Sequence, residues 1–238
     1  MRVKDVIKAA LSTDENLRNR RQWLKQVLGQ LPAGSSILDA GAGERQNRPL
    51  CAHLRYTSQD FCRYPGTGPD VGLHKGAWNT QGVDIVSDIT SIPVPDAAFD
   101  AVLCSEVLEH VPDPIVALRE LCRVTAPGGS LILTAPFSSM VHSAPYYFSS
   151  GFSRYWYEHH LKLNGFEILE LSRNGSWHDA LWQEVTRLPV MHRGVSPIGF
   201  AASLVFVALA YVLVRPFRSS NDKELGCFGW HCVARKTV

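Results

Sequence analysis

The sequence predicts an α/β fold built on a doubly wound, mostly parallel sheet, with an N-terminal helix and a late apolar helical insertion. Three observations support this prediction. Short apolar runs alternate with helical segments along the chain, a glycine-rich turn follows the first run, and successive runs end in an acidic residue. A ligand of such a sheet binds outside the carboxyl ends of the strands, so the turn and the acids are expected to share one site.

Composition sets the broad class of the protein. The chain has 238 residues, which suits one core domain with additions, and its 45% hydrophobic and 19% charged residues are ordinary for a globular protein. A formal net charge of +2 gives no reason to expect a nucleic-acid partner. The six cysteines contain no C-x-x-C pair, which favours free thiols over disulfides or a zinc site. Residues 1–22 lack the apolar core of a signal peptide, so we expect a cytoplasmic location.

Residues 1–33 are the first predicted region, and they are expected to be helical. Asp14 is a candidate N-cap, and apolar residues recur on one face further along. That stripe consists of Trp23, Leu24, Val27, Leu28 and Leu31. The Pro-Ala-Gly sequence at 32–34 ends the helix.

A glycine-rich turn follows the first strand. The apolar pair at 37–38 is followed by Asp39, and then by Gly41 and Gly43, in the spacing D-x-G-x-G. Glycine permits positive φ and lets the backbone approach a ligand closely. Where a dinucleotide-binding fingerprint would have its third glycine, this chain has Gln46.

The remaining elements follow in regular alternation. Further strands are expected at 55–60, 83–87, 99–105, 130–135, 166–171 and 229–236. Helices are expected at 44–54, at 106–125 with an interruption at 112–114, at 150–164 and at 177–188. Residues 61–82 are rich in Gly and Pro, which indicates either a functional lid or a helix that the pattern does not reveal.

Six motifs in this order resemble those of a known family. They read ILDAGAGE, SQD, VSDI, FDAVLCSEVLEHVPDP, APGGSLILTAPF and NGFEILEL. Together they resemble a class I S-adenosylmethionine-dependent methyltransferase of the type-11 methyltransferase domain family. The resemblance covers a core at 34–172 and returns at the final strand, 229–238, so that 173–228 is a helical insertion. It implies a seven-stranded Rossmann-like methyltransferase fold with S-adenosyl-L-methionine as cofactor.

The resemblance also implies a cofactor role for individual residues. The glycine turn would lie against the amino-acid and ribose parts of the cofactor, and the acid before it would help to bind the ammonium group. The acid that ends the second strand would accept both ribose hydroxyls, and the next acid and its neighbour would hold the adenine. The implied set is Asp39, Gly41, Gly43, Asp60, Asp88, Ile89 and Ser105. The alternative for each acid is an ordinary loop or capping carboxylate.

A second group of residues has the chemistry of a metal site. Glu106, Glu109 and His110 share one helical face at spacings of three and four, and His142 follows the strand at 130–135. Such a set suits a divalent ion such as Mg²⁺ or Mn²⁺. It is similar to the pattern in ubiquinone-biosynthesis O-methyltransferases and small-RNA 2′-O-methyltransferases. The alternative is that the acids only favour a helix start and bind no metal.

The expected reaction is methyl transfer to an oxygen of a small-molecule, lipid-linked or glycan acceptor. By the same resemblance, the aromatic-rich segment 136–157 covers the acceptor, although such a cluster also suits a core. His142 is the candidate general base, because imidazole titrates near neutral pH. Two other functions remain open: a methyltransferase-like binding protein without turnover, and an NAD(P)-linked oxidoreductase, against which Gln46 argues.

The run at 198–214 is uncharged over seventeen residues, which is at the short limit for crossing a bilayer. Arg193 precedes it and Arg215 and Arg218 follow it, so the basic flanks select no orientation. A single crossing would also separate the final strand from its sheet. The run is therefore a core helix, an interfacial helix or a shallow hairpin, and we expect monotopic attachment to the inner face of the membrane.

Overall fold

The computed structural model describes residues 15–66, 72–73, 76–214 and 223–237. The chain divides into two compact units. The first, called the sheet unit, comprises Arg20–Arg173 and Gly229–Val238. The second, called the hairpin unit, comprises Met1–Asn19 and Asn174–Phe228. Each unit is described by itself below.

Within the described residues, seven strands form one sheet in the order β3-β2-β1-β4-β5-β7-β6. Strands β1, β2, β3, β4 and β5 pair in parallel, whereas β7 pairs antiparallel with β5. The predicted doubly wound, mostly parallel sheet is thus confirmed. The strands are β1 Ser36–Ala40, β2 Arg55–Asp60, β3 Ile85–Val86, β4 Phe99–Ser105, β5 Thr125–Pro136, β6 Phe166–Asn174 and β7 Gly229–Lys236.

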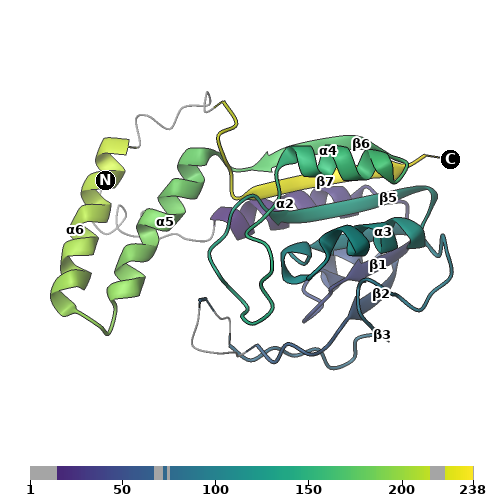
Figure 1. Ribbon diagram of the computed structural model, residues 1–238, viewed down its shortest axis with the longest axis horizontal. Coiled ribbons are helices and arrows are strands. Elements are labelled where there is room, and N and C mark those ends of the chain that lie inside the picture. The colour runs from purple at the N-terminus through teal and green to yellow at the C-terminus, as the bar shows by residue number, and fades with distance from the viewer. Residues whose placement is uncertain (1–14, 67–71, 74–75, 215–222, 238) are drawn as a thin grey trace. The chain divides into compact units, whose positions relative to one another are not determined.

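Helices cover both faces of the sheet. Figure 1 shows α3 (Pro114–Val124) and α4 (Arg154–Leu163) on the near side, and α2 (Glu15–Gly29) behind the sheet. The apolar stripe predicted for α2 is buried, with Leu24, Val27 and Leu28 packed in one cluster with residues of β1, β4 and β5. Burial of such side chains contributes ~1.5–3 kcal/mol each, so this cluster anchors α2 on the sheet.

Helix α3 begins where its sequence requires. The Asp113 carboxylate accepts a hydrogen bond from the backbone N–H of Val116 at 3.1 Å, and Pro114 occupies the first turn, where no N–H partner is needed. Leu118 and Leu121 are buried. The proline-rich interruption in the sequence is therefore the start of this helix.

Several predicted elements are shorter than expected. The helix expected at 44–54 is a turn followed by the 3₁₀ helix η1 (Arg48–Cys51), because Arg45 has a φ of +56°. The helix expected from 106 is only the 3₁₀ helix η2 (Leu108–His110), because Glu106 has a φ of +58°. Both non-glycine residues sit in the left-handed region, which a helix cannot include.

The ends of other helices and strands also differ from those predicted. Strand β3 is only two residues long, and α4 begins four residues later than expected. Strand β5 begins at Thr125 and carries the Pro-Gly-Gly sequence at 127–129, where its register with β4 shifts. Such an irregularity accommodates Pro and Gly inside a strand. In the described part of 61–82 there is no helix, and Leu73 instead forms a parallel bridge with His142.

The hairpin unit contains two antiparallel helices, α5 (Trp177–His192) and α6 (Pro197–Val214). Ser176 and Asp179 form a capping box at the start of α5. The rings of Trp182 and Tyr211 lie 5.5 Å apart between the two helices. Among the described residues, no helix combines the length and the apolar character that crossing a bilayer requires. The predicted N-cap Asp14, and the flanking Arg215 and Arg218, lie outside the described residues.

Candidate active site at the carboxyl ends of the strands

A cavity of about 370 Å³ lies in the sheet unit, at the carboxyl ends of β1, β2 and β4. Its position is the one expected for a ligand of an open α/β sheet. Most of the residues that the sequence singled out contribute to its wall. These are Gly41, Gly43, Asp60, Asp88, Ile89, Glu106, His110 and His142.

The glycine turn after β1 forms one part of the wall. Gly41 and Gly43 have φ angles of +71° and +51°, which side chains disfavour. A Cβ at Gly41 would lie 2.5 Å from the methyl carbons of Val107, and one at Gly43 would lie 2.5 Å from the Trp78 ring. Only glycine fits these two positions, and both glycines line the cavity.

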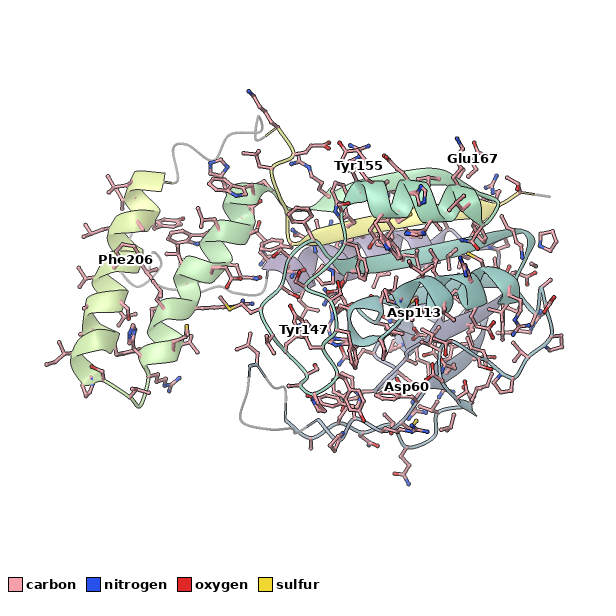
Figure 2. The ribbon with its side chains drawn as sticks, viewed as in Figure 1. Asp60, Asp113, Tyr147, Tyr155, Glu167 and Phe206 are labelled. Carbon is pink, nitrogen blue, oxygen red and sulfur yellow. The ribbon has the colours of Figure 1, made fainter. Side chains whose placement is uncertain are left out.

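Asp60, which Figure 2 labels, is fixed by hydrogen bonds from the main chain. One carboxylate oxygen accepts from the backbone N–H of Gly43 at 2.9 Å, and the other accepts from that of Cys62 at 2.7 Å. The residue is only 6% exposed, yet it lines the cavity. Each carboxylate oxygen has more than one lone pair, so Asp60 can also accept from two hydroxyl groups of a ligand.

Asp88 and Ile89 continue the wall beyond β3. The Oδ1 atom of Asp88 accepts hydrogen bonds from the backbone N–H and the hydroxyl of Thr90, at 2.9 and 2.7 Å. These bonds, chiefly the one from the backbone, lower the pKa of Asp88. The side chain is therefore ionised near neutral pH and is held at the cavity rim, next to the buried Ile89.

Two predicted cofactor residues do not reach the cavity wall. Asp39 is only 1% exposed and accepts a hydrogen bond from the Tyr56 hydroxyl at 2.7 Å. Its burial raises its pKa from 3.8 to about 6. Asp39 points to the same face as Ile37, because side chains alternate along a strand, and that face packs under α2. The Ser105 hydroxyl is hydrogen-bonded to that of Thr134 at 2.8 Å.

Glu106 is held in an unusual backbone conformation by several contacts. Its N–H donates to the carbonyl oxygen of Thr134 at 2.8 Å. One carboxylate oxygen accepts from the Thr134 hydroxyl at 2.9 Å, and the other pairs with Arg20 of α2 at 2.6 Å. Arg20 also lines the cavity, and no local pattern in the sequence indicates this role, because its partner lies 86 positions away.

Glu109, His110 and His142 form a cluster in which one candidate ligand atom of each lies within 4.8 Å of the others. Glu109 is fully buried, and its Oε1 atom lies 3.7 Å from Nε2 of His110 and 3.9 Å from Nε2 of His142. Both distances exceed the length of a hydrogen bond. The structure does not bring Glu106 into this cluster, because Arg20 and Thr134 hold its carboxylate elsewhere.

Both imidazole rings are oriented by the main chain. Nδ1 of His110 lies 2.6 Å from the carbonyl oxygen of Tyr146, and Nδ1 of His142 lies 2.9 Å from that of Met140. A carbonyl oxygen only accepts, so each Nδ1 carries the proton, and a neutral ring then presents its Nε2 lone pair towards Glu109. This is the arrangement in which histidines bind metal ions.

Two segments distant in sequence are joined over this cluster. The backbone N–H of Leu73 donates to the carbonyl oxygen of Val141 at 2.9 Å, and that of Ser143 donates to Leu73 at 3.0 Å. The carbonyl oxygen of Glu109 also accepts from the backbone N–H of Phe148. These bonds place His142 opposite Glu109.

Aromatic side chains form the rest of the wall. Phe61 and Tyr146 meet edge to face with their ring centroids 5.0 Å apart, and Tyr64 lies near both Tyr146 and Trp78. Tyr146 belongs to the aromatic segment that the sequence connected with the acceptor. The other three lie in 61–82, where the absence of any periodicity hid their role.

The fold and this cavity define the class of the protein, a class I S-adenosylmethionine-dependent methyltransferase fold. A family model described as a methyltransferase domain matches residues 14–181. The chain therefore belongs to the methyltransferase domain family, and the class predicted from its motifs is confirmed. S-adenosyl-L-methionine is the cofactor of this family.

Curated relatives share the family but differ in length. A protein of Renibacterium salmoninarum named demethylmenaquinone methyltransferase is 36% identical over 138 residues, covering 56% of this chain and 54% of the relative. A protein of Xanthomonas oryzae pv. oryzae named ubiquinone biosynthesis O-methyltransferase is 46% identical over 111 residues, covering 43% of each. The chain spans about half the length of such relatives, or less.

Solved structures share the fold. The Haemonchus contortus phosphoethanolamine N-methyltransferase 2, in complex with S-adenosyl-L-methionine, has a TM-score of 0.51 at 14% identity, covering 94% of this chain and 52% of the other. The [4+2]-cyclase SpnF has a TM-score of 0.55 at 22% identity, covering 90% and 81%. At these identities the likeness concerns the fold alone, which different reactions can share.

Proposed function

We propose that the protein transfers the methyl group of S-adenosyl-L-methionine to a hydroxyl oxygen of a small-molecule or lipid-linked acceptor. The observation that carries this proposal is that one cavity contains both sets of residues. The glycine turn and Asp60 line it together with His110 and His142. A cofactor and an acceptor could therefore lie in the same cavity, as an in-line transfer requires.

The residues at one end fit the cofactor. Gly41 and Gly43 line the cavity in a conformation and a packing that leave no room for a Cβ, and Asp60 can accept from two ribose hydroxyls. Asp88 and Ile89 suit an adenine amino group and ring. When bound, the cofactor supplies a methyl group on a sulfonium, which is already activated for transfer.

The charged amino-acid end of the cofactor needs partners of both signs. Asp39 does not line the cavity, whereas Arg20 and Glu106 line it as an ion pair with 2.6 Å between them. Such a pair offers N–H donors to a carboxylate and oxygen acceptors to an ammonium group. We therefore assign this end to Arg20 and Glu106 in place of Asp39.

Glu109, His110 and His142 fit a divalent metal ion. Their donor set is one carboxylate and two imidazoles, each imidazole being oriented through its Nδ1. The two imidazole ligands favour Fe²⁺ or Zn²⁺, whereas the carboxylate also suits Mn²⁺ or Mg²⁺. Such an ion would act as a Lewis acid towards an oxygen. The same Nε2 of His142 cannot bind a metal and act as a general base at once, and chelation distinguishes these two roles.

The cavity wall and the relatives support an apolar hydroxylated acceptor. Phe61, Tyr64, Trp78 and Tyr146 can pack against a flat or apolar group. Two relatives are named for demethylmenaquinone and for ubiquinone biosynthesis. We therefore place a small aromatic or lipid-linked hydroxyl compound before a glycan.

The test has two parts. Calorimetry with S-adenosylhomocysteine measures whether the full-length chain binds the cofactor product, and no binding would overturn the proposal. Transfer is then followed with S-adenosylmethionine labelled in its methyl group, using 3,4-dihydroxybenzoate and a bacterial lipid extract as acceptors. Label recovered as a methyl ether supports the proposal. Binding without transfer, with or without added Mn²⁺, would favour the binding protein without turnover.

A further inference from the structure

The outer surface of α6 is apolar although it is exposed. The helix carries no charged residue over its whole length. One stripe, at spacings of four, faces inwards: Ser203 and Val207 are buried, and Tyr211 contacts Trp182 of α5. A surface helix normally presents polar residues on its other side. Here that side is made of apolar residues instead.

The exposed side chains of α6 are large and contiguous. Phe206 (Figure 2) is 52% exposed, Leu209 is 59% exposed and Val212 is 65% exposed, and they lie at spacings of three along one face. Val205, Leu213 and Ile198 extend the surface, and Val190, Met191 and Val195 continue it where α5 turns into α6. A contiguous exposed apolar surface indicates an interaction site.

The charges in the sequence that flanks this surface have one sign. No acidic residue occurs between Glu184 and Asp222, a stretch that contains Arg187, Arg193, Arg215 and Arg218. Arg187 is paired with Glu184 at 2.7 Å, which leaves three arginines beyond that pair. A second copy of the chain would bring these like charges together. An anionic lipid surface would complement them.

The polar groups of the hairpin are compatible with a lipid environment. The Ser203 hydroxyl donates to the carbonyl oxygen of Phe200 at 2.8 Å, and the backbone N–H of Gly199 donates to the Ser196 hydroxyl at 3.0 Å. Lipid tolerates a backbone only where its polar groups are satisfied internally, as they are in a helix. Strand β6 precedes the hairpin and β7 follows it, and both strands belong to the same sheet, so a single crossing of a bilayer by the hairpin would separate them.

We propose that α5 and α6 form a monotopic membrane anchor, whose apolar face inserts into one leaflet of an anionic bilayer while the arginines contact its headgroups. The anchor would hold the sheet unit at the membrane, whatever its acceptor. Binding strength would then depend on two separable terms, the buried apolar area and the attraction to anionic lipid.

Vesicle flotation of the full-length chain tests both terms. Wild type is expected to float with vesicles of phosphatidylcholine and phosphatidylglycerol in equal parts, and more weakly with phosphatidylcholine alone. The triple variant Phe206→Gln, Leu209→Gln, Val212→Gln is expected to lose about 100-fold in partitioning. Changing Arg193, Arg215 and Arg218 to Gln should lower partitioning by about fivefold per arginine on the anionic vesicles only.

A matched control uses exposed apolar residues of the sheet unit. The triple variant Val86→Gln, Tyr155→Gln, Leu163→Gln changes side chains that are at least as exposed, and it should float like wild type. Two outcomes would overturn the proposal: wild type remaining with the unbound protein at both compositions, or a wild-type dimer that the α6 variant makes monomeric. S-adenosylhomocysteine binding is measured on every variant, so a failed anchor and a failed cofactor site are distinguished.

Discussion

The two ends of the cavity are built in different ways. At the cofactor end, the Asp60 carboxylate is bonded directly to the main chain, at 2.9 Å to Gly43 and 2.7 Å to Cys62. At the other end, the imidazoles of His110 and His142 face Glu109 at 3.7 and 3.9 Å and are each bonded to a carbonyl oxygen behind them. The Asp60 carboxylate is satisfied by the main chain. The three side chains of the second end face one another at distances longer than hydrogen bonds.

Carboxylates along the strand ends show the same contrast. Asp88 is held at the rim by Thr90, and these hydrogen bonds lower its pKa. Asp39 is buried under α2, and burial raises its pKa to about 6. Two acids that look alike in the sequence therefore differ in burial and in the direction of their pKa shift, and a strand-end position alone does not identify a ligand-binding group.

The largest expected effect is the loss of cofactor affinity when Asp60 is substituted. Asp60→Ala should weaken S-adenosylhomocysteine binding by at least about 100-fold, because two hydrogen bonds to a charged acceptor contribute ~1.5–3 kcal/mol each. Calorimetry measures the loss. Equal affinity in wild type and variant would remove Asp60 from the cofactor site.

Asp84→Ala is the matched control for this change. The Asp84 carboxylate accepts from the N–H and the hydroxyl of Ser58, at the same edge of the sheet but away from the cavity. This control should lose stability by about 1 kcal/mol and keep its cofactor affinity. A drop in affinity equal to that of Asp60→Ala would mean that the loss reflects general damage to β2.

Two glutamates that are three residues apart, Glu106 and Glu109, are expected to differ in their effect on metal binding. Glu109→Gln should lower Mn²⁺ affinity by about 10–100-fold, because the amide has lost the charge that a cation needs. Glu106→Gln should change it by less than about twofold, because that carboxylate already bonds Arg20 and Thr134.

Removing metal ions with a chelator tests whether methyl transfer depends on the proposed metal. Excess chelator should abolish methyl transfer by wild type, and added Mn²⁺ should restore it. Full activity in chelator would make His142 a general base or a structural residue. Equal Mn²⁺ affinity in the two glutamine variants would contradict the assignment of Glu109.

The sequence predicted which strand-end residues line the cavity better than it predicted the cluster around Glu109, for a physical reason. Strand ends in a parallel sheet meet at one edge, so Gly41, Gly43, Asp60 and Asp88 could be placed together from local patterns alone. The helical spacing at 106–110 suggested one shared face, but the positive φ of Glu106 turns its side chain to a different partner. A local pattern does not reveal such a backbone conformation.

Contacts across long separations explain what was missed. Arg20 reaches Glu106 from α2, and Trp78 reaches the glycine turn from a segment without periodicity. The burial of Asp39 depends on the packing of α2 and Tyr56 against its face of the strand, which the strand pattern alone does not reveal. Such contacts exist only once the elements are packed.

A substitution in the glycine turn is expected to have a smaller effect, on the stability of the fold. Gly41→Ala should destabilise the fold by about 2–3 kcal/mol, because its Cβ would collide with Val107 at 2.5 Å and its φ is +71°. Val107→Ala in the same chain should relieve the collision but not the backbone strain. Chemical denaturation of both single variants and the double variant measures the coupling, and strict additivity would contradict the contact.

The smallest net effect is expected for Asp39→Asn. The pKa of Asp39 is raised from 3.8 to about 6, so the folded chain holds this proton more tightly than the unfolded chain. The stability of wild type should therefore fall as pH rises from about 4 to 6, by up to ~3 kcal/mol at 1.36 kcal/mol per pKa unit, and stay low above that window.

The Asp39→Asn variant does not titrate, so its stability does not fall over this pH range. At neutral pH its gain is offset by ~1–3 kcal/mol for burying an amide N–H₂ in place of an oxygen, which leaves a net change of about 1 kcal/mol. Denaturation curves from pH 4 to 7 should show the variant gaining on wild type, while S-adenosylhomocysteine affinity changes by less than about threefold, since Asp39 does not line the cavity. A tenfold loss of affinity would return Asp39 to the cofactor site, where the sequence alone had placed it.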